Sequence, residues 1–375
     1  MNSPRPQGVH DQTFVLRRLI ELHGAADPPS EAWLLGVGGG VGFQAITFEY
    51  RDTPPVFYVG TRCAHQYAHD AAFLQRAAAG VGFDVQVSEK AGRKKGAALL
   101  DAALERGPVV AWVGLETLLG VPATLGETPW VVVVRARTGD AYIVEDVNAG
   151  CITVEARALS TARKSLKEAK NRILSISEAG PVDPAAAVYE AVARCVAELD
   201  GAHVTGGSRK SFGLAALERW ARHADSSGKK GWRTRFADGE NLLCGIRQAY
   251  GWIERATGGG AFRPLYARFL RRAAGVTGDE RFLDAAKTFD ENGACWSSLG
   301  ARMMDASVPL LSEGRSRIDA APWPEPMAPV HRWSTRSEEL PEEWAADFYP
   351  ELAERLSDLH ARELRAKELL ASIVA

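Results

Sequence analysis

The apolar positions follow a helical period near the N-terminus, a strand-like pattern in the middle of the chain, and a helical period again beyond residue 184. One face of the first helical stretch collects Val15, Leu16, Leu19 and Ile20. Their three- and four-residue spacing predicts an amphipathic helix that begins at His10-Asp11 and ends at His23-Gly24. Five glycines follow between Gly36 and Gly42.

Two segments in the middle of the chain carry runs of β-branched residues, 108–115 (PVVAWVGL) and 130–138 (WVVVVRART). Such runs predict buried strands. Thr138-Gly139-Asp140 predicts a hairpin turn into another strand at 141–147. We also expect strands at 56–62, 83–87 and 172–177, and helices at 65–79, 94–106 and 158–171. Helices ahead of a run of strands are typical of an α+β domain.

Beyond Pro181-Val182-Asp183-Pro184 the pattern is almost purely helical, which predicts a helical bundle. The helical segments are 184–200, 212–224, 238–256, 262–274 and 279–305. A proline-rich arm follows at 320–335. The amphipathic segment 342–373 mixes both signs of charge, so we expect a packing or homodimer helix rather than a membrane one. The expected domains are 1–180, 181–319, and 320–375 for the arm and last helix.

Composition narrows the class of protein. The chain has 375 residues, 46% of them hydrophobic and 25% charged, with a net charge of −2. No basic field favours nucleic acid, and no apolar run reaches the ~18 residues of a membrane span. The N-terminus lacks the apolar core of a signal peptide, so we expect a cytoplasmic protein. Five scattered cysteines argue against a disulfide framework.

His10-Asp11, Ser30-Glu31-Ala32 and the glycine run that ends at Gly42-Phe43 together resemble the N-terminal domain of the butirosin biosynthesis protein H family. Members read His-Cys before the apolar helix, then Ser-Glu-Ala, then a glycine run ending Gly-Phe. The segments Phe212-Gly213-Leu214, Ala216–Trp220, Lys230-Gly231-Trp232 and Gly258–Arg263 look like the helical domain of unknown function that often follows. The resemblance implies a papain-like, cysteine-protease-type domain followed by an all-α domain.

In that family a cysteine attacks a thioester, a histidine deprotonates the cysteine, and an aspartate orients the histidine. The matching positions here are Asp11, Trp130 and Asp146. Two of the three functional groups have therefore changed, and no histidine lies between His69 and His203. Acyl transfer through a cysteine thioester is disfavoured at this position.

Three interpretations of Asp11 remain open. It acts as a general acid or base, with its pKa raised by Trp130 and Asp146; it anchors a substrate amine; or it caps its own helix. Trp130 stacks on a substrate or fills a gap at the end of a strand. Gln12 could donate its amide to a developing oxyanion. We expect His10, Gln12, Trp130, Gly39, Gly40 and Phe43 to contact substrate.

Two other patterns compete for the functional site. Cys63, His65, His69 and Asp70 combine metal-ligand types with i,i+4 histidines, but a third ligand is not evident and Gln66 replaces a catalytic glutamate. The alternatives are a nucleophilic Cys63 beside His65, or ordinary surface histidines. The glycine run matches neither nucleotide-binding motif, so close backbone packing or a turn lining the cleft explains it better. We expect neither metal nor cofactor.

The resemblance implies a specialised-metabolite (natural product or antibiotic) enzyme that forms or cyclises an amide on an aminoacyl or peptidyl substrate, and the residues at the matching positions imply that it works without a covalent thioester. The alternative is an inactive homologue that binds a partner or an intermediate. The resemblance implies a small-molecule or carrier-protein-bound aminoacyl substrate. Two groups of basic side chains either form solvated helix faces or bind an acidic carrier protein. The first group is Arg93, Lys94, Lys95, Arg163, Lys164, Lys167 and Lys170. The second group is Arg209, Lys210, Lys229, Lys230 and Arg233.

Overall fold

The computed structural model describes residues 8–51, 53–62, 71–121, 126–202, 206–320 and 334–375. Contacts between Cα atoms divide the chain into two compact units. The first unit takes residues 1–38, 66–188 and 325–328, and the second takes 39–65, 189–324 and 329–375. Both helices and antiparallel sheets are present, so the fold is mixed α and β.

The first unit is built around a six-stranded sheet with the order β3-β8-β4-β5-β6-β7, in which every neighbouring pair is antiparallel. Its strands are β3 (Phe83–Ser88), β4 (Val109–Gly114), β5 (Pro129–Thr138), β6 (Ala141–Asp146), β7 (Gly150–Glu155) and β8 (Ile173–Ala179). Its helices are α1 (Asp11–Leu22), α2 (Glu31–Val37), α3 (Ala72–Ala79), α4 (Arg93–Leu104), α5 (Leu115–Leu119), α6 (Ala156–Ser165) and the short η1 (Lys167–Ala169).

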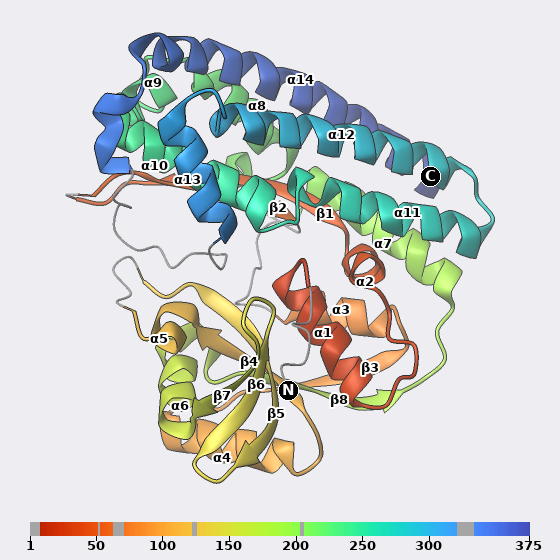
Figure 1. Cartoon of the computed structure of the whole chain (residues 1–375). Helices are drawn as coiled ribbons and strands as arrows, with labels where there is room; N and C mark the ends of the chain where they lie inside the picture. Colours follow the sequence, from red (N-terminus) through yellow and green to blue (C-terminus); the bar gives the residue numbers. More distant parts are fainter. Residues whose placement is uncertain (1–7, 52, 63–70, 122–125, 203–205, 321–333) are drawn as a thin grey trace. The chain divides into compact units, whose positions relative to one another are not determined.

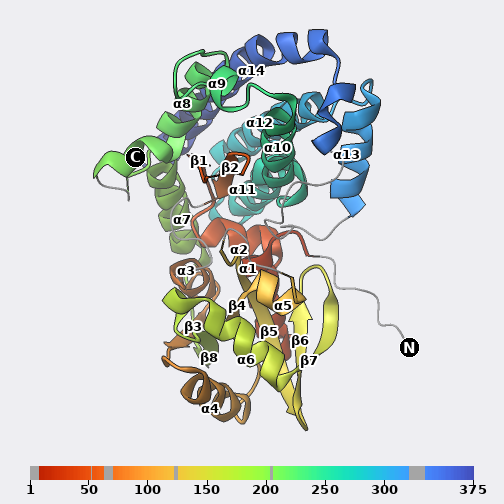
Figure 2. The same cartoon turned by 90° about the vertical axis from the view of Figure 1, so that its left-hand side faces the viewer.

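Helices cover both faces of this sheet (Figures 1 and 2). The apolar cluster on one face joins alternate residues of β4, β5 and β6 to α4 and α6, including Val132, Val144 and Leu159. On the other face, α1 contacts β4, β5 and β6. Burial on both faces explains why β4 and the first part of β5, residues 130–134, are continuously apolar rather than alternating, since neither side of these segments meets water.

The second unit combines a two-stranded hairpin with a helical assembly. The hairpin pairs β1 (Val41–Phe48) with β2 (Val56–Arg62). The helices are α7 (Pro184–Leu199, which begins in the first unit), η2 (Gly206–Ser211), α8 (Gly213–Ala224), α9 (Trp232–Arg235), α10 (Gly239–Tyr250), the π-helical η3 (Gly251–Arg255), η4 (Gly260–Phe262), α11 (Arg263–Thr277), α12 (Arg281–Met303), α13 (Pro309–Ala320), η5 (Ser334–Glu339) and α14 (Glu342–Val374).

The hairpin belongs to the core of this second unit, whereas the sequence placed residues 39–65 in the first domain. Strand β1 contacts α8 and strand β2 contacts α10. Phe43 and Phe57 are buried in one cluster with Trp220 and Trp296. The second unit is therefore not purely helical. Helix α14 packs on α8 and α12 and buries Leu352, Leu356 and Leu359.

A fully buried ion pair holds several parts of the second unit together. Arg263 Nε donates to Glu363 Oε1 over 2.8 Å, and both side chains have no exposed area. The same guanidinium donates to the carbonyls of Gly42, Thr61 and Ala261. Because Gly42 and Thr61 lie on β1 and β2, this arginine binds the hairpin to α11 and α14.

Across the described ranges, no helix combines the length and the apolarity that crossing a membrane requires.

Candidate functional site

Helix α1 begins at His10, which is its N-cap residue. The extended backbone of His10 (φ −130°, ψ 129°) lets its carbonyl accept the N–H of Phe14 over 2.9 Å. Its Nδ1 atom accepts the backbone N–H of Thr13 over 3.3 Å. A side-chain acceptor at this position satisfies one of the unpaired amides of the first turn. His10 therefore performs the capping that one interpretation assigned to Asp11.

Asp11 is the first residue of α1, and its Oδ1 lies 3.1 Å from Nε2 of His10. Because Nδ1 of His10 accepts an N–H, the hydrogen-bond network assigns the ring proton to Nε2, which donates it to Asp11. The side chain of His10 is 6% exposed and that of Asp11 is 15% exposed. The structure thus brings together an oriented histidine and a largely buried carboxylate at a helix N-terminus.

Glu31, from the Ser-Glu-Ala motif, fixes the loop before α1. Its carboxylate accepts the backbone N–H groups of Val9 and His10 over 3.0 and 3.1 Å, and the hydroxyl of Thr13 over 2.8 Å. Ser30 caps α2 by accepting the N–H of Trp33, which places Glu31 in the first turn. Sequence reasoning missed Glu31 as a site residue, although the motif that contains it was recognised.

Gln12 follows Asp11 and is 1% exposed. Among the described residues, neither its amide nitrogen nor its amide oxygen has a hydrogen-bond partner. A buried amide without partners costs free energy, about 1–3 kcal/mol for each unsatisfied group. The site therefore contains one buried donor and one buried acceptor that a bound group could satisfy.

Trp130 and Asp146 are joined directly. The indole Nε1–H of Trp130 donates to Asp146 Oδ2 over 2.6 Å. The other oxygen, Oδ1, accepts the backbone N–H groups of Asn148 and Ala149 over 2.8 and 2.7 Å. Trp130 can only donate in this contact, because an indole has no lone pair to accept a proton.

The side chains of Trp130 and Asp146 point to the face of the sheet that α4 and α6 cover. Trp130 belongs to the same apolar cluster as Val144. Glu145, between Val144 and Asp146, points to the opposite face, where Arg18 of α1 donates to it over 2.7 Å. Strand alternation therefore separates Asp146 from the face that α1 packs against. This arrangement does not support the expected acid–base pair of Asp11 and Asp146.

A salt bridge from Arg18 to Glu145 ties α1 to the sheet, and the segment before α1 also packs closely on it. Glu145 is 2% exposed at its side chain and accepts from Arg18 and Arg135. The hydrogen bond to Glu145 is the main cause that raises the pKa of Arg18. A Cβ on Gly8 would lie 2.8 Å from Val147, so the chain before α1 runs close to the residue that follows Asp146.

The remaining expected substrate contacts lie in the second unit. Phe43 is fully buried and stacks on Trp220 and Trp296, with ring centroids 6.3 and 5.6 Å apart. A Cβ on Gly40 (φ +72°) would lie 2.7 Å from the ring of Tyr266, which explains the glycine by close packing. Gly39 also has a positive φ of 121°. These residues serve packing within their own unit.

The rival site at Cys63, His65, His69 and Asp70 lies outside the described residues. Among residues that the structure does describe, no three His, Cys, Asp or Glu side chains gather as metal ligands. Arg163 is not a surface cation, because it is 1% exposed and donates to the carbonyls of Gly96 and Asn171. Lys94, Lys95 and Lys164 are exposed.

One protein-family model matches the chain, a domain of unknown function (DUF4872), over residues 157–315. The match runs from α6, in the first unit, to α13, in the second. It includes the helical segments on which part of the sequence resemblance depends. A search of curated proteins found no match.

Proposed function

We propose that the chain is a specialised-metabolite enzyme that joins an amine to an acyl group, between molecules or as a ring closure, on an aminoacyl or peptidyl substrate. Asp11 is the acid–base group of this proposal. The observation that carries it is the contact between Nε2 of His10 and Oδ1 of Asp11. His10 caps the helix through Nδ1 and orients the carboxylate of Asp11 through Nε2.

In the proposed reaction the substrate amine attacks the acyl carbon, and a C–N bond forms. Asp11 takes the proton that the amine loses and returns it to the thiolate or alkoxide that leaves. Gln12 donates its amide N–H to the acyl oxygen, where negative charge develops. Asp146 has no share in this proton transfer and acts as the residue that positions Trp130. The site needs no covalent thioester.

The aminoacyl substrate class comes from the resemblance to the butirosin biosynthesis protein H family, and with it the proposal that a carrier protein delivers the acyl group. A helix packed on an antiparallel sheet supports a papain-like architecture for the first unit. The capped start at His10-Asp11 coincides with the family's nucleophile position. The DUF4872 match supports the second half of the resemblance.

A second candidate function is a binding protein without catalytic activity. The hydrogen bond from Trp130 to Asp146 favours it, because the resemblance assigns the position of Trp130 to a catalytic histidine and an indole cannot take a proton. In that case the unpartnered amide of Gln12 would serve recognition alone.

The test compares wild type with Asp11→Asn on a panel of aminoacyl N-acetylcysteamine thioesters with amine acceptors, and measures amide product by mass spectrometry. We expect Asp11→Asn to lose about 100-fold or more in kcat/KM at unchanged thermal stability. Asp140→Asn, at an exposed turn of the same unit, is the matched control. Equal turnover by wild type and Asp11→Asn would overturn the acid–base role.

If neither protein forms an amide, calorimetry with the same thioesters separates the two candidate functions. Binding without turnover, weakened by Gln12→Leu, would establish the binding protein. Neither binding nor turnover would reject both candidates for this class of substrate.

A further inference from the structure

The first unit has a basic surface where two segments that are distant in the sequence meet. Residues 89–95 connect β3 to α4 and form the first turn of that helix, and residues 163–172 lead from α6 to β8. Together they contain nine basic and two acidic residues, a net charge of +7 in a chain whose net charge is −2. Charge of one sign is therefore concentrated in this part of the unit.

Hydrogen bonds hold the two segments together. Lys90 N–H donates to the carbonyl of Lys170 over 2.9 Å, and Asn171 Nδ2 donates to the carbonyl of Lys90 over 2.8 Å. The buried guanidinium of Arg163 donates to the carbonyls of Gly96 and Asn171. The basic residues of both segments therefore lie on neighbouring parts of the surface.

Most of these basic side chains are exposed and have no acidic partner. Arg172 is paired with Glu89 over 2.7 Å, and Arg163 is buried. Within the described part of the chain, the other seven form no salt bridge, and Glu168 is the one acidic residue left among them. The seven that form this basic surface are Lys90, Arg93, Lys94, Lys95, Lys164, Lys167 and Lys170.

Helix stability does not explain these charges. Arg93, Lys94 and Lys95 occupy the first turn of α4, and its N-cap, Gly92, makes no side-chain hydrogen bond. The positive end of the helix dipole lies at this turn, so acidic residues stabilise it and cations do not. Neutralising one of these lysines should leave the thermal stability unchanged or raise it.

The residue types indicate a partner with a diffuse negative charge. Six of the seven side chains are lysines, which are flexible point charges rather than planar forks that bind two oxygens at once. Specific protein interfaces usually contain Trp, Tyr or Arg anchors, and single-stranded nucleic acid stacks on aromatic side chains. Among the exposed residues of the two segments, Arg93 is the single residue of these types.

The placement of the charges also differs from that of a DNA-binding helix. A helix that enters a DNA groove carries its contacts along the helix. Here the charges lie in the first turn of α4, in the last turn of α6 and in the connections beside them. This arrangement fits an extended anionic surface better than a groove.

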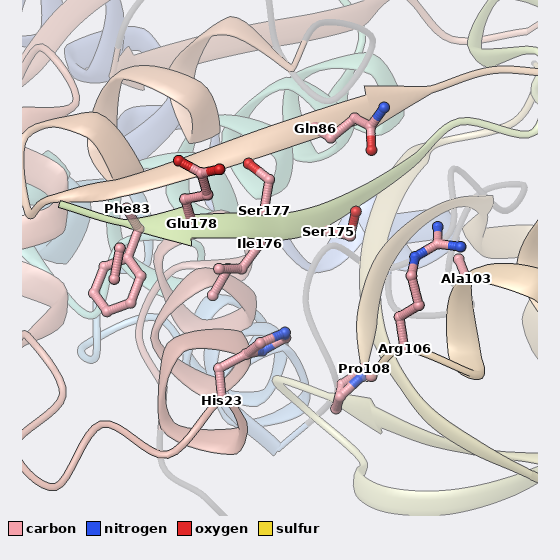
Figure 3. A pocket seen from close by; sticks show the side chains of 12 residues that line it. His23, Phe83, Gln86, Ala103, Arg106, Pro108, Ser175, Ile176, Ser177 and Glu178 are labelled. Atoms are coloured by element: carbon pink, nitrogen blue, oxygen red, sulfur yellow. The ribbon is translucent and has the colours of Figure 1, made fainter.

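The other end of β8 does not share this charge. A groove of about 520 Å³ lies there, and it carries both signs of charge on Arg106 and Glu178 (Figure 3). Arg106 is exposed and forms no salt bridge with a described residue. It is therefore a matched control for the loss of one positive charge in the same unit.

We propose that this basic surface binds the head groups of an anionic lipid bilayer without inserting into it. Clusters of four to eight Lys or Arg residues bind anionic leaflets, and each such residue near the leaflet strengthens binding about fivefold. The attraction extends only about 8 Å at physiological salt, so it acts on exposed side chains. The proposal concerns a surface outside the proposed acyl-transfer site and does not depend on the proposed function.

The experiment is cosedimentation of the full chain with vesicles of phosphatidylcholine, either pure or containing one third phosphatidylglycerol. We expect binding to the anionic vesicles alone, and loss of that binding at high salt. Lys94→Gln in α4 and Lys167→Gln in η1 should each weaken binding about fivefold, and the double variant about 25-fold, because separate charges contribute independently to binding a planar surface. Arg106→Gln should leave binding unchanged, and no lysine variant should melt at a lower temperature.

Four outcomes would overturn the proposal. The first is equal binding to both kinds of vesicle, or binding to neither. The second is an equal loss from Arg106→Gln and Lys94→Gln, because the attraction would then not belong to this surface. The third is a loss confined to one lysine, which would indicate a site for a single anionic group. The fourth is lysine-dependent binding of duplex DNA that is tighter than binding of the anionic vesicles at the same salt, which would assign the surface to nucleic acid.

Discussion

The imidazole of His10 makes two contacts with the first turn of α1: its Nδ1 accepts the N–H of Thr13, and its Nε2 donates to Asp11 over 3.1 Å. The orientation of the Asp11 carboxylate therefore depends on how the helix begins. Glu31 adds to this by accepting the N–H of His10 from the neighbouring loop. The same side chain therefore caps the helix and orients the carboxylate of the proposed acid–base site.

Two substitutions of His10 separate these roles. Asn is a good N-cap but is too short to reach Asp11, so His10→Asn should change the free energy of unfolding by less than ~1 kcal/mol. It should nevertheless reduce amide formation, because the carboxylate loses its donor. His10→Ala should lose the cap as well, at about 1–2 kcal/mol in chemical denaturation. If His10→Asn keeps full turnover on the thioester panel, the orienting role is wrong.

The hydrogen bond between Trp130 and Asp146 should appear as a coupling energy. Trp130→Phe removes the donor and leaves Asp146 Oδ2 without it, while the two backbone donors to Oδ1 remain. In a double-mutant cycle with Asp146→Asn, urea denaturation should give about 1–2 kcal/mol of coupling. Trp130→His can still donate and should be more stable than Trp130→Phe. Additive effects of the two substitutions would contradict the bond.

Much of the first unit was visible in the sequence because its signals are local. Runs of β-branched residues marked β4 and β5, and Thr138-Gly139-Asp140 marked the turn into β6, where Gly139 has φ +60°. The start of α1 was visible from its apolar spacing. The sequence also predicts that Trp130 and Asp146 lie close together, because the two positions lie on paired strands. It does not predict the direction in which their side chains point.

What the sequence could not show depends on contacts between distant segments. The sequence predicts a strand at 56–62 but none at 41–48, and nothing local indicates that Phe43 packs on Trp220 and Trp296. Nor does the pattern around Arg263 reveal that its partner is Glu363, a hundred positions away.

The buried pair of Arg263 and Glu363 should respond asymmetrically to substitution. Arg263→Met leaves Glu363 as an uncompensated buried charge and removes donors from three carbonyls, so we expect a loss of about 3–5 kcal/mol. Glu363→Gln keeps an acceptor for Trp296 Nε1, which contacts the same oxygen over 2.8 Å, and should cost less. The exposed pair of Arg362 and Asp358 is the control, and Arg362→Gln should cost under ~0.5 kcal/mol. Equal losses for Arg263→Met and Arg362→Gln would contradict this account.

Tyr142 should make stability fall at alkaline pH. Burial, with the hydrogen bond to Asp101 Oδ1 over 2.6 Å, raises the pKa of Tyr142 to about 12. An unfolded tyrosine has a pKa of about 10. Between these values the unfolded chain releases a proton that the folded chain keeps, so the free energy of unfolding decreases as pH rises. The contribution of Tyr142 is complete below pH 10 and is lost as pH rises through 12.

Urea denaturation of wild type and Tyr142→Phe at pH 9 and pH 11 measures this effect. The difference in unfolding free energy between the two proteins should shrink at pH 11 by about 1 kcal/mol, the equivalent of most of one pKa unit. Tyrosinate absorbance supplies an independent reading, because the wild-type minus Tyr142→Phe difference should titrate near 12 rather than near 10. A difference spectrum that titrates near 10, with a pH-independent difference in stability, would show that the hydroxyl is not held by Asp101 in solution.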